Sequence, residues 1–361
     1  MKRLNILLNA ALLLCCTTTL AQPISTSLLE SEKMPEGTVY FLPKTVVHFH
    51  LLIEKKVYTP GIFSRYAERY LMRQDVPQEK DISHRLLDFQ LSLTGIRDTS
   101  KCFIVNLKGK SATAEILRSD DGVLLAVNDT PMVVRQPQPF VPSERQPTGD
   151  PLQLLSADVM QAGSMARKAE LTALQIAELQ EHRQQLITGE AEEMPTDRTQ
   201  LQLMLDEIDR TSQQLLSLFV GTTVCDTTEQ HIAICPDKEM QREVIFRISK
   251  LQGLVDSDDL SGQPFYLSLE DLHQQTQQEF GFPENKKDGG FYTCVPGIVR
   301  LTLYREDQEL ATYNYPFAQF GFTELHGGSL FKKYPTHLRL NPITGALEKL
   351  HAEHFPASVS H

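Results

Sequence analysis

Tryptophan is absent from this chain of 361 residues, and so are the short motifs that usually mark an enzyme or a zinc site. Sugar-binding sites commonly stack rings on tryptophan, so its absence weighs against a dedicated carbohydrate-binding role, while 10 tyrosines and 17 phenylalanines keep other aromatic contacts available. No Cys-x-x-Cys pair occurs, which argues against a finger-type zinc site. No Gly-x-Ser-x-Gly elbow occurs, so acyl-transfer chemistry lacks its expected nucleophile. The sequence therefore assigns no catalytic residues and no cofactor.

Long apolar runs are also missing after the first 21 residues. Within those residues, Lys2 and Arg3 precede an apolar stretch at 6–14, and Ala21 is the small residue that signal peptidase prefers at a cleavage site. Nine residues are too few to cross a bilayer, which takes about 20. We therefore expect a cleaved signal peptide at 1–21, an exported protein in the periplasm or outside the cell, and no transmembrane segment.

Lipid anchoring is the alternative fate of this segment, because Cys15 and Cys16 lie inside it. A lipoprotein signal carries a small residue before the modified cysteine, whereas Leu14 stands there. Ordinary cleavage is the favoured interpretation.

Basic residues are fewer than acidic ones. Removing Lys2 and Arg3 from the 35 basic residues leaves 33 against 46 acidic residues, a formal charge of −13. This sign repels phosphate backbones and anionic lipid, so no nucleic-acid partner is expected. A mature chain of about 340 residues is too long for one compact core, which favours two or three domains.

Four cysteines remain after cleavage, namely Cys102, Cys225, Cys235 and Cys294. An even number in an exported chain permits up to two disulfides, with three possible connectivities. Cys225 and Cys235 are the closest pair, and a short loop between two strands would bring them within bridging range. Free buried thiols are the other interpretation.

The spacing of apolar residues predicts an α+β, mainly β fold: two β-sandwich-like domains with a long antiparallel helical hairpin between them. We expect an N-terminal β-rich domain at 22–134, a Pro-rich linker at 135–155, the hairpin at 156–220 and a C-terminal β-rich domain at 221–361. Only one short helix, at 62 to about 73, is expected in the first domain. The predicted strands are 39–42, 46–57, 86–93, 102–107, 112–118 and 123–127 in the first domain, and 224–235, 243–248, 265–269, 292–295, 298–304, 310–315, 337–340 and 346–350 in the last.

The predicted hairpin has apolar residues at spacings of three, four and seven in both helices. Thr188-Gly189-Glu190 is expected to end the first helix and Pro195-Thr196-Asp197 to begin the second. Each apolar stripe is too narrow to stabilise an isolated helix, so the pair must bury its seam on itself and against a neighbouring domain or partner. A homodimer through the hairpin is one such arrangement.

Several segments resemble an uncharacterised exported family of Bacteroidetes catalogued as domain of unknown function 4831. The resemblance covers nearly all of the mature chain in order and implies a Gram-negative cell envelope, with no activity or binding residue to carry over. The segments are 39–45 (Val-Tyr-Phe-Leu-Pro-Lys-Thr), 58–71 with Pro60-Gly61, 75–77 (Asp-Val-Pro), 122–128 (Gly-Val-Leu-Leu-Ala-Val-Asn), 186–190 (Leu-Ile-Thr-Gly-Glu), 194–195 (Met-Pro), 319–321 (Gln-Phe-Gly) and 341–347 (Asn-Pro-Ile-Thr-Gly-Ala-Leu).

Arginines recur every four residues along the predicted short helix, at Arg65, Arg69 and Arg73, beside Tyr66 and Tyr70. Such a stripe can bind a carboxylate or a phosphate with the tyrosines packed beneath it. A solvated helix face is the competing interpretation. These five residues are the predicted contacts for a small anionic ligand.

His48 and His50 alternate with Val47, Phe49 and Leu51 in a predicted strand, so the histidines share a mixed face while the other face is apolar. Two imidazoles on one face can share a metal, but a site needs further ligands, such as Glu54 or another histidine. Cross-strand pairing is the favoured interpretation, so no metal is assigned.

The function predicted from these observations is that of a non-enzymatic binding or interaction protein of the cell envelope. Its partner would be another envelope protein or a small anionic ligand. The alternative is a hydrolase of envelope or dietary polymers that uses an unrecognised carboxylate pair, because carboxylates distant in sequence can converge in space.

Overall fold

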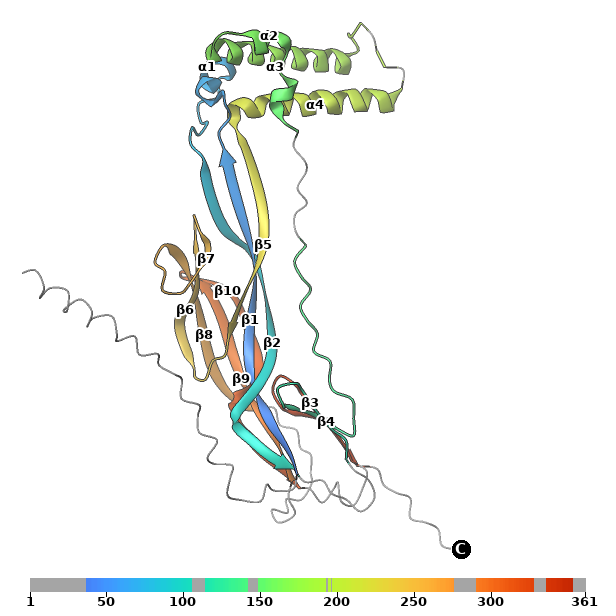
Figure 1. Cartoon of the computed structure of the whole chain (residues 1–361), viewed down its shortest axis with the longest axis vertical. Coiled ribbons are helices and arrows are strands. Elements are labelled where there is room, and N and C mark those ends of the chain that lie inside the picture. The colour runs from blue at the N-terminus through green and yellow to red at the C-terminus, as the bar shows by residue number, and fades with distance from the viewer. Residues whose placement is uncertain are drawn as a thin grey trace, which may run out of the picture.

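The computed structural model describes residues 37–105, 114–141, 149–192, 194–195, 197–275, 290–327 and 336–352. The predicted signal peptide lies outside these residues. The molecule is elongated, with the helices at one end and most strands at the other (Figure 1). Three long strands run between the two ends.

These three strands form one antiparallel sheet in the order β2-β1-β5. They are β1 (Thr38–Thr59), β2 (Asp81–Val105) and β5 (Thr222–Ile234). The alternation expected around His48 is confirmed, because Val47, Phe49, Leu51 and Ile53 are at most 2% exposed on one face of β1. The other face carries the histidines and is half-buried.

A second antiparallel sheet, in the order β10-β9-β8-β6-β7, packs against the buried face of β1. Phenylalanine and leucine side chains from both sheets fill the space between them, including Phe246, Phe265, Leu301 and Phe317. The strands are β6 (Met240–Ser249), β7 (Gly253–Val255), β8 (Gly262–Gln275), β9 (Gly290–Arg305) and β10 (Gln308–Gly327).

A third sheet, in the order β12-β11-β4-β3, lies at the end of the molecule opposite the helices (Figure 1). Its strands are β3 (Ile116–Arg118), β4 (Leu124–Val127), β11 (Thr336–Leu340) and β12 (Leu347–Ala352). Its core also takes Tyr40 and Leu42 from the beginning of β1. Gly345 has φ 71° in the turn between β11 and β12, a conformation that favours glycine.

The predicted α+β, mainly β fold is confirmed, with 51% of the described residues in strands, 23% in helices and the helical hairpin between two strand regions. Strands from the two β-rich segments share sheets, because β5 pairs with β1 and β11 pairs with β4. An alternating pattern shows which face of a strand is buried but not which strand lies beside it. The division of the chain into domains stays a prediction.

The helices form what we call the helical head: η1 (Ser64–Tyr66), α1 (Ala67–Leu71), η2 (Pro151–Leu154), α2 (Ala157–Gln161), α3 (Met165–Thr188) and α4 (Arg198–Val220). The predicted hairpin is α3 and α4. Ser164 caps α3 by accepting a hydrogen bond from the Arg167 N–H at 3.2 Å, and Gly189 ends it with φ 78°. The apolar seam joins Ala169, Ile176, Leu215, Leu218 and Phe219 to Phe63 and Ala67.

Gly61 allows the chain after β1 to approach the hairpin closely. A Cβ at this position would lie 2.1 Å from the carbonyl oxygen of Leu218 in α4. The Phe63 N–H donates to the same oxygen at 2.8 Å. The head is therefore attached directly to the end of β1.

The four cysteines among the described residues, Cys102, Cys225, Cys235 and Cys294, are free. Cys225 and Cys235 lie ten positions apart along and just past β5, so about 33 Å of extended chain separates their Cα atoms, far above the roughly 7 Å limit for a disulfide. The hypothesis of a short loop between them is therefore wrong. Burial raises the pKa of Cys294 to about 11.

Thr45 of β1 is hydrogen-bonded to β10 and to the turn between β11 and β12. Its Oγ1 donates to the Ile343 carbonyl at 3.2 Å and accepts from the Ala318 N–H at 3.0 Å. The Gln319 amide binds the Thr45 N–H and carbonyl, each at 2.9 Å, and also reaches the Pro236 carbonyl. Because Thr45 is fully buried, each of these groups depends on the others for its hydrogen bond.

Thr45→Val should lower the free energy of unfolding by about 1–3 kcal/mol, because it leaves a buried N–H and a buried C=O without their partner. Urea denaturation of the mature chain measures the change. Thr223→Val is the matched control, since Thr223 is exposed on β5, and it should change stability by less than about 0.5 kcal/mol. Equal stability of the two variants would contradict the role given to Thr45.

Candidate functional site

The predicted arginine stripe is not a single helix face. Arg65 lies in η1, Arg69 lies in α1, and Arg73 follows the helix, which ends at Leu71. Met72 turns the chain with φ 56° and so ends the helix earlier than predicted. A spacing of four residues places the three arginines on one face only if the helix continues to Arg73.

The three arginines nevertheless stay together on one short exposed segment. All three side chains are exposed, and none forms an ion pair with a residue of the described ranges. The Arg69 guanidinium lies 5.4 Å from the centroid of the Tyr70 ring, and the Tyr66 and Tyr70 rings are 6.3 Å apart. Both tyrosines pack against the apolar seam of the head. The structure thus presents a cationic surface over half-buried rings, which can contact an acidic group.

His48 and His50 belong to a cluster of three histidines on the outer face of the long-stranded sheet. Strand pairing places His231 of β5 directly opposite His50. His48 Nδ1 and His231 Nε2 are 2.8 Å apart, and their rings stack at 4.9 Å. The His50 ring is tilted against His231, also at 4.9 Å. The sequence did not indicate His231, because only the pairing of β1 with β5 brings it there.

The remaining ring nitrogens of His48 and His50 are hydrogen-bonded to side chains of neighbouring strands. His48 Nε2 lies 2.6 Å from Thr94 Oγ1, and His50 Nε2 lies 3.0 Å from Ser92 Oγ. His50 Nδ1 lies 3.3 Å from a carboxylate oxygen of Glu229. The other Glu229 oxygen accepts from the Phe140 N–H at 3.4 Å.

This arrangement is cross-strand hydrogen bonding, as the favoured interpretation of the sequence has it. Across the part of the chain that the structure describes, no three histidine, cysteine or acidic side chains are placed to hold a metal ion. Glu54, the further ligand considered from the sequence, instead accepts from Arg85 Nε at 2.5 Å. Burial lowers the pKa of His48, and the nearby His231 and His50 lower it further.

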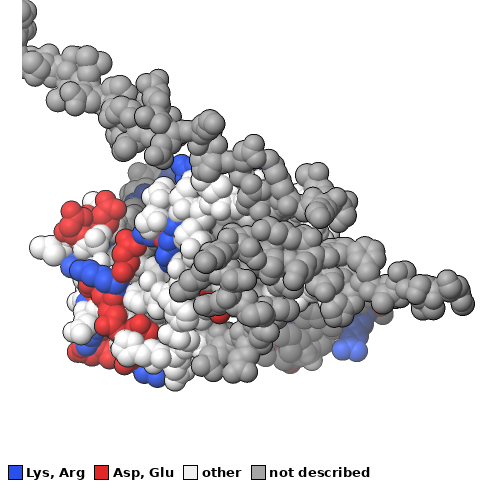
Figure 2. Space-filling model, turned by 90° about the horizontal axis from the view of Figure 1, so that it is seen from below, with Lys and Arg blue, Asp and Glu red and all other residues white. Residues whose placement is uncertain are grey.

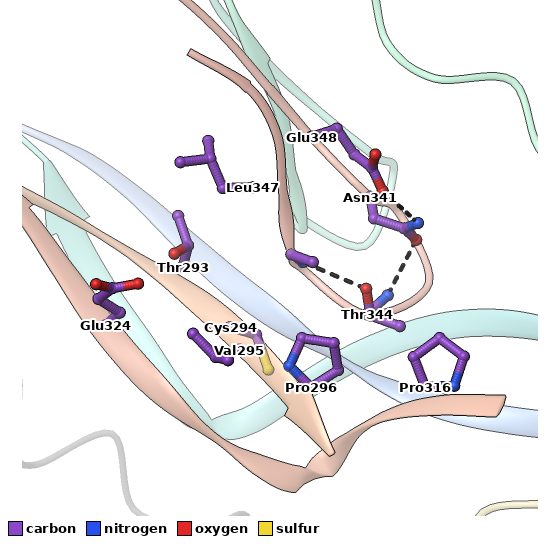
Figure 3. A pocket seen from close by; sticks show the side chains of 11 residues that line it. Thr293, Cys294, Val295, Pro296, Pro316, Glu324, Asn341, Thr344, Leu347 and Glu348 are labelled. Atoms are coloured by element: carbon purple, nitrogen blue, oxygen red, sulfur yellow. Dashed lines mark hydrogen bonds between the residues drawn. The ribbon is translucent and has the colours of Figure 1, made fainter. Parts of the chain in front are cut away.

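One small pocket contains two carboxylates, Glu324 from β10 and Glu348 from β12 (Figure 3). Its volume is about 110 Å³, well below the 300–1,000 Å³ of ligand sites. Asn341 Nδ2 donates to Glu348 at 2.9 Å. Figure 3 shows Glu324 and Glu348 on opposite sides of the pocket, with Cys294 and Pro296 between them.

Larger grooves lie at the sheet edges. One of about 980 Å³ is lined by His231 and by acidic residues that all belong to the turn 256–259. One of about 580 Å³ lies between β2 and residues 132–137 and has no carboxylate in its lining. One of about 440 Å³ contains Glu239 and Glu270, but Glu239 accepts from the Asp271 N–H and Glu270 pairs with Arg300. None of these grooves presents two unengaged carboxylates from opposite walls.

The end of the molecule opposite the head has a mixed surface. On the part of that end drawn in colour, acidic and basic side chains lie interspersed (Figure 2). Within the second sheet and its turns, Arg242 pairs with Asp307 at 3.1 Å and Arg300 pairs with Glu270 at 2.9 Å.

A family model described as a domain of unknown function, DUF4831, matches residues 36–348 of the chain. Neither a curated protein nor a solved structure matches the chain. No helix among the described residues is long and apolar enough to span a membrane.

The lowered pKa of His48 predicts that acid destabilises the protein. The unfolded chain binds a proton to this imidazole at a higher pH than the folded chain does, so stability is lost as the pH falls below about 6.5. His48→Gln removes this titration, so the stability of the variant should fall less between pH 7.5 and pH 5. Urea denaturation at several pH values measures the slope.

His182→Gln provides the control, because His182 is an exposed residue of α3 outside the cluster. This variant should keep the slope of the unchanged protein. An identical slope for His48→Gln and for the unchanged protein would show that the pKa of His48 is not lowered in the folded chain.

Proposed function

The chain belongs to the DUF4831 family, whose function is unknown, and from that premise we propose that it is a non-enzymatic interaction protein of the cell envelope. The helical head is the part that makes the contact. The predicted signal peptide supports an exported protein in the periplasm or outside the cell, and its cleavage without lipid anchoring is part of the proposal.

The observation that carries the proposal is the position of the head. The strands β1, β2 and β5 hold it away from the other two sheets, at one end of the molecule (Figure 1). A projecting head is open to partners from several sides. The core between the two larger sheets takes residues 47–53 of β1 and does not reach the end of the strand that meets the head. A β sandwich alone would therefore not need this extension.

Exposed apolar side chains on the hairpin support the same function. Leu174 is 52% exposed, Ile187 is 51% exposed and Leu203 is 65% exposed. Single exposed apolar residues are common on protein surfaces, but these three lie together on one projecting hairpin. The predicted contact residues Arg65, Arg69, Arg73, Tyr66 and Tyr70 belong to the head, which fits an acidic partner or a small anionic ligand.

The alternative function, hydrolysis through a carboxylate pair, receives no comparable support. Such a mechanism needs two carboxyl groups on either side of a bond that is held in a pocket. The pocket that contains Glu324 and Glu348 is too small for a sugar ring, and the acidic residues of the groove of about 980 Å³ lie in a single turn.

A photo-cross-linking amino acid at Leu174 or at Leu203 should trap a partner of the head in cells of the native host. The control carries the cross-linker at Tyr313, which is exposed on β10, outside the head. We expect discrete cross-linked species from the two head positions and none from the control. Absence of cross-links at both head positions, or equal cross-linking at all three, would refute the proposal.

A further inference from the structure

Two ring nitrogens of the histidine cluster face each other across the strands β1 and β5. His48 Nδ1 and His231 Nε2 are 2.8 Å apart, and the two rings stack. In the hydrogen bond between them, one nitrogen carries a proton and the other accepts it, because two lone pairs at this distance repel each other. The same two nitrogens can instead bind one cation that lies between them.

The spacing of these nitrogens fits a transition-metal ion. Imidazole nitrogens lie about 2.0–2.1 Å from Zn²⁺, so two of them in tetrahedral geometry are about 3.3 Å apart. His48 and His231 reach that distance if their rings separate by about half an ångström from the observed 2.8 Å. Neutral imidazole is a ligand that suits Zn²⁺ and Cu²⁺, whereas Mg²⁺ and Ca²⁺ prefer oxygen.

Thr94 of β2 orients the His48 ring. Its Oγ1 lies 2.6 Å from His48 Nε2, the ring nitrogen that does not contact His231. When Nε2 donates its proton to this hydroxyl, Nδ1 carries the lone pair that a metal ion requires. Histidines that bind metal commonly have such a hydrogen bond on their second nitrogen. His231 is exposed, so an ion can enter from solvent.

His50 is the nearest further imidazole. It lies directly opposite His231 in the pairing of β1 with β5, and the two ring centroids are 4.9 Å apart. Its nitrogens are turned elsewhere, with Nε2 at 3.0 Å from Ser92 Oγ and Nδ1 at 3.3 Å from Glu229. Among the described side chains, these three rings therefore do not yet converge on one point. Rotation of the His50 ring breaks one hydrogen bond to a side chain and brings a third nitrogen within reach.

The groove beside His231 has an acidic wall. Among the described residues, the lining of this groove of about 980 Å³ contains the three aspartates of the turn 256–259 and no lysine or arginine. Arg247 donates to a backbone carbonyl of the turn at 2.8 Å, and Arg135 lines a different groove, beside Ser92. A cation is therefore attracted to the groove through which it reaches His231.

From these observations we propose that the histidine cluster binds one divalent transition-metal ion, Zn²⁺ or Cu²⁺, through His48 Nδ1 and His231 Nε2, with His50 as the third ligand. The ion joins β1 to β5, the two strands that connect directly to the head. The site lies on the sheet, outside the head, so this inference goes beyond the proposed function and does not rest on it.

Isothermal titration calorimetry of the mature chain, purified without a polyhistidine tag, tests the site with ZnCl₂ and CuCl₂ at about pH 7.5. We expect one ion per chain, with a Kd of about 10 µM or lower for Zn²⁺ and a lower Kd for Cu²⁺. MgCl₂ should give no binding. At about pH 5 the binding of Zn²⁺ should be lost, because protons compete for the ring nitrogens.

Substitution of each proposed ligand locates the site. His48→Gln, His231→Gln and His50→Gln should each raise the Kd for Zn²⁺ at least about tenfold, since even loss of a hydrogen bond to a metal ligand costs about 10–100-fold. His351→Gln is the matched control, because His351 lies opposite His337 in the pairing of β11 with β12. This variant removes another cross-strand histidine pair and should keep the Kd of the unchanged chain.

Urea denaturation with and without Zn²⁺ gives a second measurement. An ion that binds only the folded chain lowers its unfolding constant about 100-fold when present at about 100 times its Kd. The unchanged chain and His351→Gln should show this shift, and the three ligand variants should lose most of it. Each variant is compared with itself, so a loss of stability caused by the substitution is not mistaken for a loss of binding.

Four results would overturn the site. They are no binding of either ion at about 100 µM, an unchanged Kd in both His48→Gln and His231→Gln, an unchanged Kd in His50→Gln, and loss of binding in His351→Gln. None of these results concerns the head, whose proposed contacts are tested separately by cross-linking.

Discussion

Strand β1 organises the molecule, because its buried apolar side chains belong to two of the three cores. Tyr40 and Leu42 belong to the core of the third sheet, and Val47, Phe49, Leu51 and Ile53 belong to the core between the two larger sheets. The same strand then continues to Thr59 and meets the head through the close approach at Gly61. Fully burying one such side chain contributes about 1.5–3 kcal/mol, so this single stretch is a large part of the stability of an ordinary domain.

The length of β1 has a functional consequence. Only the first part of β1 packs against the other sheets. The rest of β1 extends with β2 and β5 toward the helices (Figure 1). The face of this sheet opposite the core carries the histidine cluster, and Glu54 pairs with Arg85 just beyond residues 47–53. The head therefore stands on a sheet whose register is defined by pairing of β1 with both β2 and β5.

The sequence indicates those features that depend on neighbouring residues. Alternation around His48 predicts the buried face of β1, Gly189 predicts the end of α3, and Gly345 predicts the last turn. Features that depend on distant pairing are not visible there. The contact of His231 with His48 spans 183 residues and follows only from the register of β5 on β1. The regular spacing of the arginines predicts a helix that continues to about residue 73, and this prediction is wrong. Met72 adopts a left-handed conformation, which ends α1 early and breaks the arginine stripe.

The central claim is that the head is held away from the sheets and stays available for contact. Small-angle X-ray scattering of the dilute mature chain tests it most directly. A compact globule of about 340 residues has a radius of gyration of about 20 Å. The account predicts a clearly larger radius and a pair-distance distribution with a long tail from the projecting head. A radius near 20 Å with a symmetric distribution would mean that the head folds back onto the sheets, which contradicts the account.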